Sequence, residues 1–311
     1  MPRNFPDIWL GRVEKRLENT DIAPWLDGIS EVPGDVIVVG EGTDGEKCLI
    51  HIPTTDFEPD VLINNTAYPI ALQEYTDDTV TIALDKYQTK VTTISDDMAL
   101  GATYDKIDTA TGTHVSSVNT NKYGRAIHAL APNSDSADTP VIKTTGADDG
   151  SGRKRLLKND IVELKKKFDV LQVPLIGRRL VLSPDHIADL LSQDQVFAGQ
   201  YYNYTSGKVL NLFGFEVYEY VANPNFNATT GTKKSFGSIP GMGDYQASVA
   251  FYVPNVAKKT GLTKQYFKDS KIAPSTQTNQ LNYRHYFIAC PKRAMYLGAI
   301  ISDVIKEVTN P

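Results

Sequence analysis

The fold is decided by residues 156–193, LLKNDIVELKKKFDVLQVPLIGRRLVLSPDHIADLLSQ, together with residues 207–221, GKVLNLFGFEVYEYV. Five apolar residues in the first stretch recur at helical spacing and predict one buried helix face: Leu157, Ile161, Leu164, Phe168 and Leu171. Asp160 is positioned to cap this helix, and Glu163 follows three residues later to close a capping box.

A short strand and a second helix follow the first helix. Residues 180–182, LVL, predict the strand, Ser183 is expected as the helix N-cap, and Pro184 fits the first helical position. Three apolar residues form the buried side of this second helix: Ile187, Leu190 and Leu191. These residues are caps and core positions, so the stretch predicts architecture and no catalytic chemistry.

This order of elements resembles the second half of the major capsid proteins of tailed double-stranded DNA bacteriophages, the family with the Hong Kong 97 fold. In that family a lysine-rich helix end leads into a V-P-x-x-x-R-x-L-V-L-S-P strand and helix, and then into a G-F-x-V-Y segment. The matching residues here are Lys165, Lys166, Lys167, Val173, Pro174, Arg178, Leu180, Val181, Leu182, Ser183, Pro184, Gly207, Gly214, Phe215, Val217 and Tyr218. The order of elements before and after these motifs also fits.

The resemblance implies an α+β fold of the Hong Kong 97 type. Such a fold has an N-terminal arm, an extended β-loop (the E-loop), a peripheral domain with a long spine helix, and an axial domain. The arm and first strands are expected at residues 1–45 and the E-loop at 46–91. The peripheral domain is expected at 92–172 and 286–311, and the axial domain at 173–285.

The function implied by the resemblance is that of a coat protein. Many copies would form pentamers and hexamers of an icosahedral shell that encloses the DNA genome, in a virion capsid assembled in the host cytoplasm. A portal, a packaging motor and a separate scaffolding protein are the expected partners. Packaged DNA would be contacted without sequence specificity, and no membrane or cofactor is expected.

Charge is distributed unevenly along the 311 residues, although the net charge is only −5. Residues 31–110 carry sixteen Asp and Glu against four Lys and Arg, whereas residues 151–311 carry twelve against twenty-one. Such a pattern favours contact between the acidic part of one copy and the basic part of another. Solvation of both parts is the alternative interpretation.

The first third of the chain is expected to be rich in strands. Five β-branched runs lie between residues 35 and 94: DVIVV, KCLIHI, VLIN, TVTIAL and KVTTI. Residues 54–79 contain six carboxylates and are expected to project as the E-loop: Asp56, Glu58, Asp60, Glu74, Asp77 and Asp78.

The apolar period becomes helical from Ser95 to Leu130, which predicts a helix of about 35 residues, the spine helix of the resembled family. Gly101, Gly112 and Gly124 weaken it, so a bend or break is expected. Further on, residues 255–268 are expected to be partly helical.

Two sets of residues are candidates for contacts between subunits. We expect Asp56, Glu58, Asp60, Asp77 and Asp78 to meet a neighbour, with Arg153, Lys154 and Arg155 as receivers. The same basic run could instead face DNA or form a solvated helix face. The only two tryptophans, Trp9 and Trp25, are candidate anchors of the arm, either on a neighbour or on the chain's own core.

Motifs for catalysis or cofactor binding fail their structural context. The turn GEGTDG at residues 40–45 fits G-x-G-x-x-G, but a strand-like run follows it where a dinucleotide fold needs a helix. The five histidines form no zinc motif, and no nucleophile elbow or Walker A loop is present. We therefore predict neither an enzyme nor a metal site.

Two other functions are also compatible with the sequence. An encapsulin-like nanocompartment shell would share the fold but enclose proteins. A cytoplasmic nucleotide-binding enzyme that uses the turn at residues 40–45 is the rival of a different class.

Overall fold

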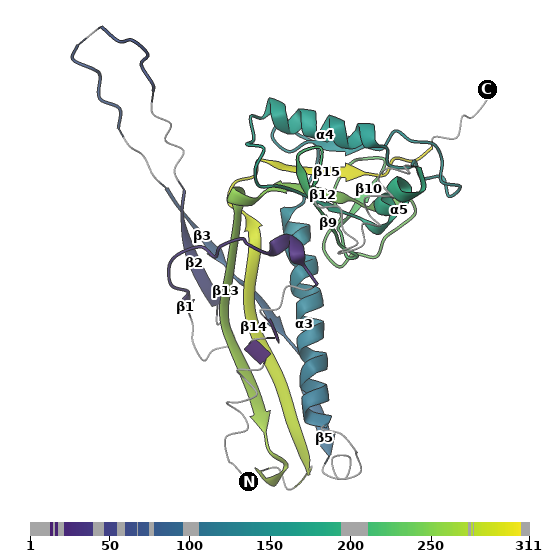
Figure 1. Ribbon diagram of the computed structural model, residues 1–311. Coiled ribbons are helices and arrows are strands. Elements are labelled where there is room, and N and C mark those ends of the chain that lie inside the picture. The colour runs from purple at the N-terminus through teal and green to yellow at the C-terminus, as the bar shows by residue number, and fades with distance from the viewer. Residues whose placement is uncertain are drawn as a thin grey trace.

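The computed structural model describes residues 13–14, 16–17, 22–39, 47–54, 60–66, 68–74, 78–95, 106–193, 211–272, 275 and 277–305, with only the backbone for 52–54, 78–80, 106–108 and 193. The described residues form two lobes, and a long loop projects away from them (Figure 1). One lobe is elongated and runs along the long helix α3. The other is compact and lies under α4.

The elongated lobe pairs α3 (Lys106–Leu130) with a four-stranded antiparallel sheet. Its strands are β4 (Asp85–Gln88), β5 (Thr92–Ser95), β13 (Val256–Lys268) and β14 (Thr278–Pro291). β14 pairs with β13 along one edge and with β4 and β5 along the other, and α3 lies against β14. The predicted spine helix is confirmed from Lys106 onward, and residues 96–105 lie outside the described residues.

The expectation that residues 255–268 are partly helical is wrong. They form β13, which pairs with β14 from Val256↔Pro291 to Lys268↔Gln280, interrupted by a register shift between Thr260 and Thr263. Lys and Gln residues in this segment are compatible with a helix or a strand. The segment is a strand because it pairs along its length with β14.

The compact lobe is built on a six-stranded sheet in the order β6-β15-β12-β7-β9-β8. Its strands are β6 (Val141–Lys143), β7 (Arg178–Leu182), β8 (Asn211–Leu212), β9 (Phe215–Glu219), β12 (Ser248–Tyr252) and β15 (Leu297–Ile301). The helices α4 (Lys158–Val170) and α5 (Pro184–Gln193) belong to this lobe, and α4 packs across β15 and β6. A small hairpin joins β10 (Asn225–Asn227) to β11 (Asp244–Gln246).

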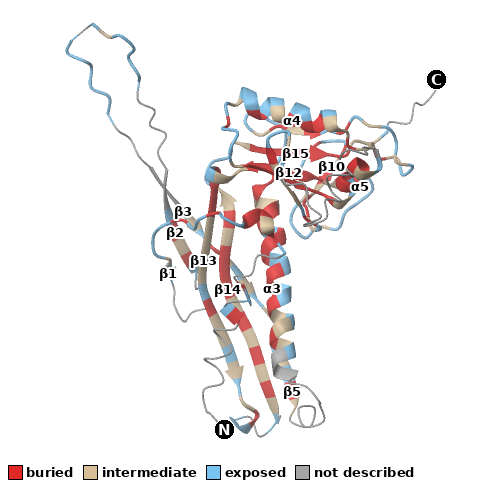
Figure 2. Ribbon diagram, in the orientation of Figure 1, coloured by how far each residue is buried: buried red, intermediate tan, exposed pale blue. Residues whose placement is uncertain are grey.

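Both faces of the six-stranded sheet are covered. Leu180 and Leu182 join the core under α4, whereas Val181 faces a second core that includes Ile127 and Leu130 from the end of α3. Figure 2 shows the strands of this lobe mostly in red, the colour of buried residues. The two lobes therefore share α3, because its last turns cover the sheet of the compact lobe.

Strand pairing does not follow the domain boundaries expected from the sequence. β13 falls within residues 173–285 but pairs beside α3, whereas β6 and α4 fall within residues 92–172 but pack in the compact lobe. The pairings of β6 with β15 and of β14 with β4 join strands more than a hundred residues apart, and no local pattern reveals them. Short 3-10 turns lie at Pro24–Leu26, Val253–Asn255 and Ser270–Ile272.

A third sheet carries the projecting loop. β1 (Ile37–Val39) pairs antiparallel with β2 (Lys47–Thr54), and β2 pairs with β3 (Asp78–Ala83). The pairing ends at Thr54↔Asp78, and the described residues beyond it form no strand. The prediction of a strand at VLIN is therefore wrong, because residues 61–64 project into solvent with no partner strand among the described residues.

The helix starts differ in part from their predicted caps. Asp160 is not the N-cap of α4 but its third residue, and its carboxylate accepts the Leu157 N–H at 2.8 Å and the Thr145 hydroxyl at 2.6 Å. Pro184 is the first residue of α5, as predicted. Ser183 precedes it, but its hydroxyl has no hydrogen-bond partner among the described residues, and its carbonyl accepts the Ile187 N–H instead.

Two glycine substitutions should have opposite effects on subunit stability. A methyl group at Gly298 in β15 would lie 2.8 Å from the Phe168 ring and 2.9 Å from Leu164, whereas one at Gly124 in α3 would lie 3.7 Å from Phe236. We expect Gly298→Ala to lower the free energy of unfolding by roughly 1–3 kcal/mol through overpacking. Gly124→Ala should raise it by up to about 1 kcal/mol through helix propensity.

Thermal and urea unfolding of the unassembled subunit measures both effects. A Gly298→Ala subunit as stable as the unchanged chain would contradict the tight approach of α4 to β15.

Candidate interaction surfaces

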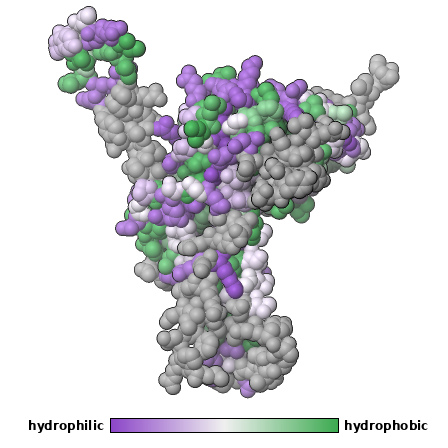
Figure 3. Space-filling view, in the orientation of Figure 1, coloured by the Kyte–Doolittle hydropathy of each residue, from purple (hydrophilic) through white to green (hydrophobic). Residues whose placement is uncertain are grey.

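The loop between β2 and β3 is acidic and also unusually apolar. Residues 54–79 contain six Asp and Glu and no Lys or Arg. Among its described residues, large apolar side chains stand in solvent: Val61, Leu62, Ile63, Tyr68, Ile70 and Leu72, the last fully exposed. Figure 3 shows hydrophobic and hydrophilic atoms side by side on this loop. Exposed apolar side chains gathered in one place indicate a surface that a partner covers.

Of the five acidic residues predicted to meet a neighbour, Asp60 is described in full and Asp78 by its backbone. Asp56, Glu58 and Asp77 lie outside the described residues, and only the backbone of Asp78 is described, at the start of β3. Asp60 is exposed, and its N–H donates to the Gln73 side chain at 2.9 Å. This bond ties the two sides of the loop together.

Arg153 does not serve as a receiver, because its guanidinium is buried and committed within the chain. Two of its nitrogens bind the Asp189 carboxylate at 2.8 and 2.9 Å, and Nε binds Asp149 at 2.9 Å. Its Nη1 also donates to the Ser302 hydroxyl at 3.3 Å. Sequence reasoning missed this role because Asp189 lies 36 residues away on α5, and charge alone gives no sign of burial.

The Arg153 network also lowers the pKa of a neighbouring carboxyl group, that of Asp149. Burial alone would raise the pKa of Asp149, but hydrogen bonds from Ser151 and the charge of Arg153 outweigh it and lower this pKa to about 2. Asp149 is therefore ionised in the folded chain at all pH values well above 2. Its stabilising effect is present above the ordinary carboxyl pKa and is lost as pH falls toward 2.

The side chains of the other two predicted receivers, Lys154 and Arg155, are only partly exposed. The Lys154 ammonium binds Asp303 at 2.8 Å, and both side chains remain partly exposed. Arg155 is half-buried, and its backbone pairs with Gly146 and Ala147. Arg153 and Lys154 thus fasten the loop before α4 to α5 and to the residues after β15.

A buried histidine completes this cluster. His186 on α5 is fully buried, and its ring nitrogens contact the hydroxyls of Ser248 at 2.6 Å and Ser302 at 3.0 Å. Burial, together with the nearby Arg153 charge, lowers the pKa of His186 to about 4, so the ring is neutral at physiological pH. A Ser–His pair with no exposed surface cannot receive a substrate, and its role is to join α5 to β12 and β15.

Trp25 anchors the N-terminal segment on the chain's own core. Its side chain has no exposed surface and meets Tyr220 and Phe251 edge-on, with ring centroids 5.6 and 6.3 Å apart. Its carbonyl accepts a hydrogen bond from Arg179 at 2.8 Å. Trp9 lies outside the described residues.

The Gly-rich turn at residues 40–45 lies outside the described residues, but its flanking strands are described. Val39 pairs with Lys47 in an antiparallel register, so the turn connects two strands of a hairpin. A dinucleotide site needs a helix after the turn.

Within the part of the chain that the structure describes, no group of His, Cys, Asp and Glu could hold a metal ion. No described helix is long and apolar enough to cross a membrane.

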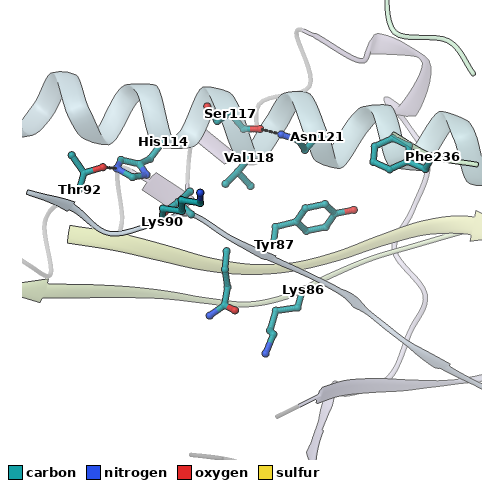
Figure 4. A pocket seen from close by; sticks show the side chains of 11 residues that line it. Lys86, Tyr87, Lys90, Thr92, His114, Ser117, Val118, Asn121 and Phe236 are labelled. Carbon is teal, nitrogen blue, oxygen red and sulfur yellow. Dashed lines mark hydrogen bonds between the residues drawn. The ribbon is translucent and has the colours of Figure 1, made fainter. Parts of the chain in front are cut away.

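An open groove of about 570 Å³ lies between α3 and β4 (Figure 4). Tyr87 turns toward the helix, and Lys86 points to the opposite side of the strands. The groove is also lined by Lys90, His114 and Phe236. The His114 ring contacts the Thr92 hydroxyl at 2.9 Å, and burial lowers its pKa. Its lining has no acid–base pair in contact, so nothing there suggests catalysis.

The loop after β10 is fastened to the end of α3. The Lys233 ammonium donates to the carbonyls of His128 at 2.8 Å and Ala131 at 2.7 Å, which are among the last acceptors of the helix. The His128 ring bonds the Lys234 carbonyl at 2.8 Å and meets the Phe236 ring edge-on at 5.6 Å. This contact, called here the α3 latch (residues 128–131 with 233–236), holds the two lobes together.

Removing the buried ion pair should destabilise the compact lobe. Asp189→Asn would leave the buried Arg153 charge without its main partner, and we expect a loss of about 3–5 kcal/mol. The matched variant Asp303→Asn breaks a partly exposed pair and should cost about 0–1 kcal/mol. Urea unfolding of the subunit compares them, and equal losses would contradict the buried role of Arg153.

The α3 latch should show a defined pH dependence. Burial lowers the pKa of Lys233 to about 8, whereas in the unfolded chain it keeps its ordinary value of about 10.5. Between these values the unfolded state binds more protons, so the contribution of Lys233 to stability rises with pH. The stability of the unchanged chain minus that of Lys233→Met should therefore grow from pH 8 to pH 10. A difference that stays constant would contradict the burial of this ammonium.

Comparisons with known proteins agree with this architecture. A family model described as phage capsid protein matches residues 76–299. A search of curated proteins found no match.

Solved structures share the fold at low sequence identity. One is from Mycobacterium phage Che8, with 14% identity, a TM-score of 0.54, and coverage of 81% of this chain and 84% of that one. Another is the capsid of cyanophage P-SCSP1u, with 14% identity, a TM-score of 0.55, and coverage of 88% and 90%. A third is a virus-like particle from Pyrococcus furiosus, with 8% identity, a TM-score of 0.55, and coverage of 96% and 100%.

The family model covers more than two thirds of the chain, from β3 to β15, and the shared fold is of the Hong Kong 97 type with the spine helix and projecting loop described above. The chain therefore belongs to the phage capsid protein family, as a structural protein that forms the capsid shell and not as an enzyme.

Proposed function

We propose that many copies of this chain form pentamers and hexamers that close into an icosahedral shell around a double-stranded DNA genome. Membership of the phage capsid family carries this proposal. The projecting loop supports it, because exposed side chains such as Ile63 and Leu72 need a covering surface that the described parts of the chain do not provide. A neighbouring subunit supplies that surface.

The two lobes correspond to the two domains of such a subunit. The compact lobe under α4 is the axial domain, which faces the centre of a pentamer or hexamer. The elongated lobe with α3, β13 and β14 is the peripheral domain, and residues 54–79 are the E-loop. The α3 latch then fixes the angle between the domains, on which the curvature of a shell depends.

The expected partners follow from this role. A separate scaffolding protein guides assembly in the host cytoplasm, a portal occupies one vertex, and a packaging motor brings in DNA that the shell contacts without sequence specificity. The encapsulin-like shell is less favoured, because the matching family is described as phage capsid protein. The content of the particle distinguishes the two shells.

The purified chain, alone or produced with the scaffolding protein, should form closed particles of megadalton mass. Light scattering after size exclusion measures the mass, and electron microscopy of stained particles shows whether they are closed. Particles from infected cells should contain DNA and no enzyme cargo. A stable monomer or dimer under all these conditions would contradict the proposal.

A variant of the loop separates assembly from folding. Ile63→Asp with Leu72→Asp alters two side chains that are 83% and 100% exposed, so the subunit should fold as before. We expect the melting temperature to stay unchanged and particle formation to be lost. Particles formed by the double variant as by the unchanged chain would show that this loop does not hold the shell.

A further inference from the structure

One glycine of β13 lies where the projecting hairpin β2–β3 joins the elongated lobe. The register of β13 against β14 shifts between Thr260 and Thr263. Gly261 and Leu262 thus stand opposite a single residue of β14, Tyr286. Two residues opposite one form a β-bulge, which bends the strand locally and interrupts its regular surface. The bulge therefore marks a special position on an otherwise continuous pair of strands.

The missing side chain of Gly261 makes room for Leu84. A methyl group on Gly261 would lie 2.8 Å from Leu84 Cδ2 and 2.8 Å from Tyr286 Cβ, closer than side-chain atoms approach each other. Leu84 is 5% exposed and shares one apolar cluster with Tyr286. Glycine keeps this hollow open, because every other residue would place a Cβ in it. We call the contact of Leu84 with Gly261 and Tyr286 the hairpin socket.

Leu84 is the single residue between the projecting hairpin and the body. It follows Ala83, the last residue of β3, and precedes Asp85, the first residue of β4. Its N–H donates to the Cys48 carbonyl of β2 at 2.8 Å. The Asp85 carboxylate accepts from the Arg125 guanidinium of α3 at 2.9 and 3.3 Å. The backbone is thus held on both sides of this joint, and the side chain of Leu84 is seated on the bulge.

The chain before β1 is attached to the same part of β13. The Val32 N–H donates to the Lys258 carbonyl at 2.9 Å, and the Lys259 ammonium donates to the Val32 carbonyl at 3.1 Å. The Glu31 carboxylate accepts the Thr260 N–H at 3.1 Å. Among the described strands, β1, β2 and β3 pair only with one another. The hairpin is therefore joined to the body around the hairpin socket and not through a shared sheet.

A small tilt at the hairpin socket would be enlarged at the loop. The β2–β3 pairing extends over five residues, from Leu49↔Ala83 to Thr54↔Asp78. At a rise of about 3.3 Å per residue this ladder is roughly 17 Å long, so a tilt of about 10° at its base moves its far end by about 3 Å. Apolar contacts need heavy atoms within about 4.0–4.5 Å, and a shift of that size breaks them. The direction of the hairpin thus decides which contacts the loop can make.

We propose that Leu84, seated in the hollow that Gly261 leaves open, sets the direction in which the projecting loop leaves the subunit. Leu84 and Gly261 are then positioning residues for shell assembly, and they act through the hairpin. This inference rests on the proposed function, because assembly is the process that the direction of the loop controls. Figure 1 shows the hairpin leaving the elongated lobe beside β13 and pointing away from α3.

The direction of the hairpin can be measured in the unassembled subunit. Spin labels on Thr81→Cys in β3 and Lys268→Cys at the end of β13, both exposed positions, report the distance between hairpin and lobe by pulsed electron paramagnetic resonance. Cys290→Ala removes the partly exposed native thiol, and Cys48 has no exposed surface. The labelled chain should give one narrow distance distribution.

Three substitutions test the hairpin socket. We expect Leu84→Ala, which empties it, to widen the distance distribution about twofold and to lower particle yield about tenfold or more. Leu84→Met should keep both values close to those of the unchanged chain, because a swap of similar volume is tolerated in a core. Gly261→Ala should shift the mean distance, since the added methyl group displaces Leu84. The two Leu84 variants decide the test even where Gly261→Ala does not fold.

The matched control is Ile94→Ala. Ile94 of β5 is 6% exposed, about as buried as Leu84, but it belongs to the cluster that β5 shares with α3. Its truncation should lower the melting temperature about as much as that of Leu84, because both leave a cavity in an apolar core. The narrow distance distribution and the particle yield should both be retained. The control therefore separates a loss of stability from a loss of direction.

Any of three results would overturn the proposal. In the first, Leu84→Ala keeps the distance distribution of the unchanged chain. In the second, the distribution widens but particles form in the normal yield. In the third, Ile94→Ala loses particles to the same extent as Leu84→Ala. All three leave the capsid function intact, whereas failure of the unchanged chain to form any particle would contradict the proposed function itself.

Discussion

The central strands of the six-stranded sheet are buried on both faces, and the rest of the structure depends on this constraint. All five residues of β7 and all five of β15 are buried. Strands of this kind cannot lie at a surface, because their apolar side chains alternate between two faces and both must leave water. One face requires α4, and the other requires the end of α3 together with Trp25.

This double coverage explains why α3 belongs to both lobes. Its last turns complete the core of the compact lobe, and its earlier turns pack on β14. The α3 latch adds polar bonds at the junction, where the carbonyls of His128 and Ala131, at and just beyond the end of α3, accept from Lys233. A shell needs such a rigid junction, since a change in angle between lobes would be repeated in every copy.

Charge serves two different purposes in the chain. Buried charges such as Arg153 and Asp189 are paired within the subunit, where they join the loop before α4 to α5. The charges of the projecting loop, with exposed Asp60 and Glu74 among the described residues, are instead all acidic. Buried pairs resist exchange because separating them leaves a charge in a low dielectric, whereas exposed groups can change partners at little cost.

Sequence alone determined the elements that local periodicity specifies. The spacing from Leu157 to Phe168 predicted α4, and Pro184 marked the first residue of α5, because a helix face and a helix start depend on residues only a few positions apart. The succession of these motifs also indicated the capsid family. Only the tertiary structure decided β13, the burial of Arg153 and the docking of Trp25. Each of these features depends on strand register or on burial by other segments of the chain. Neither strand register nor burial can be predicted from the residues of the segment itself.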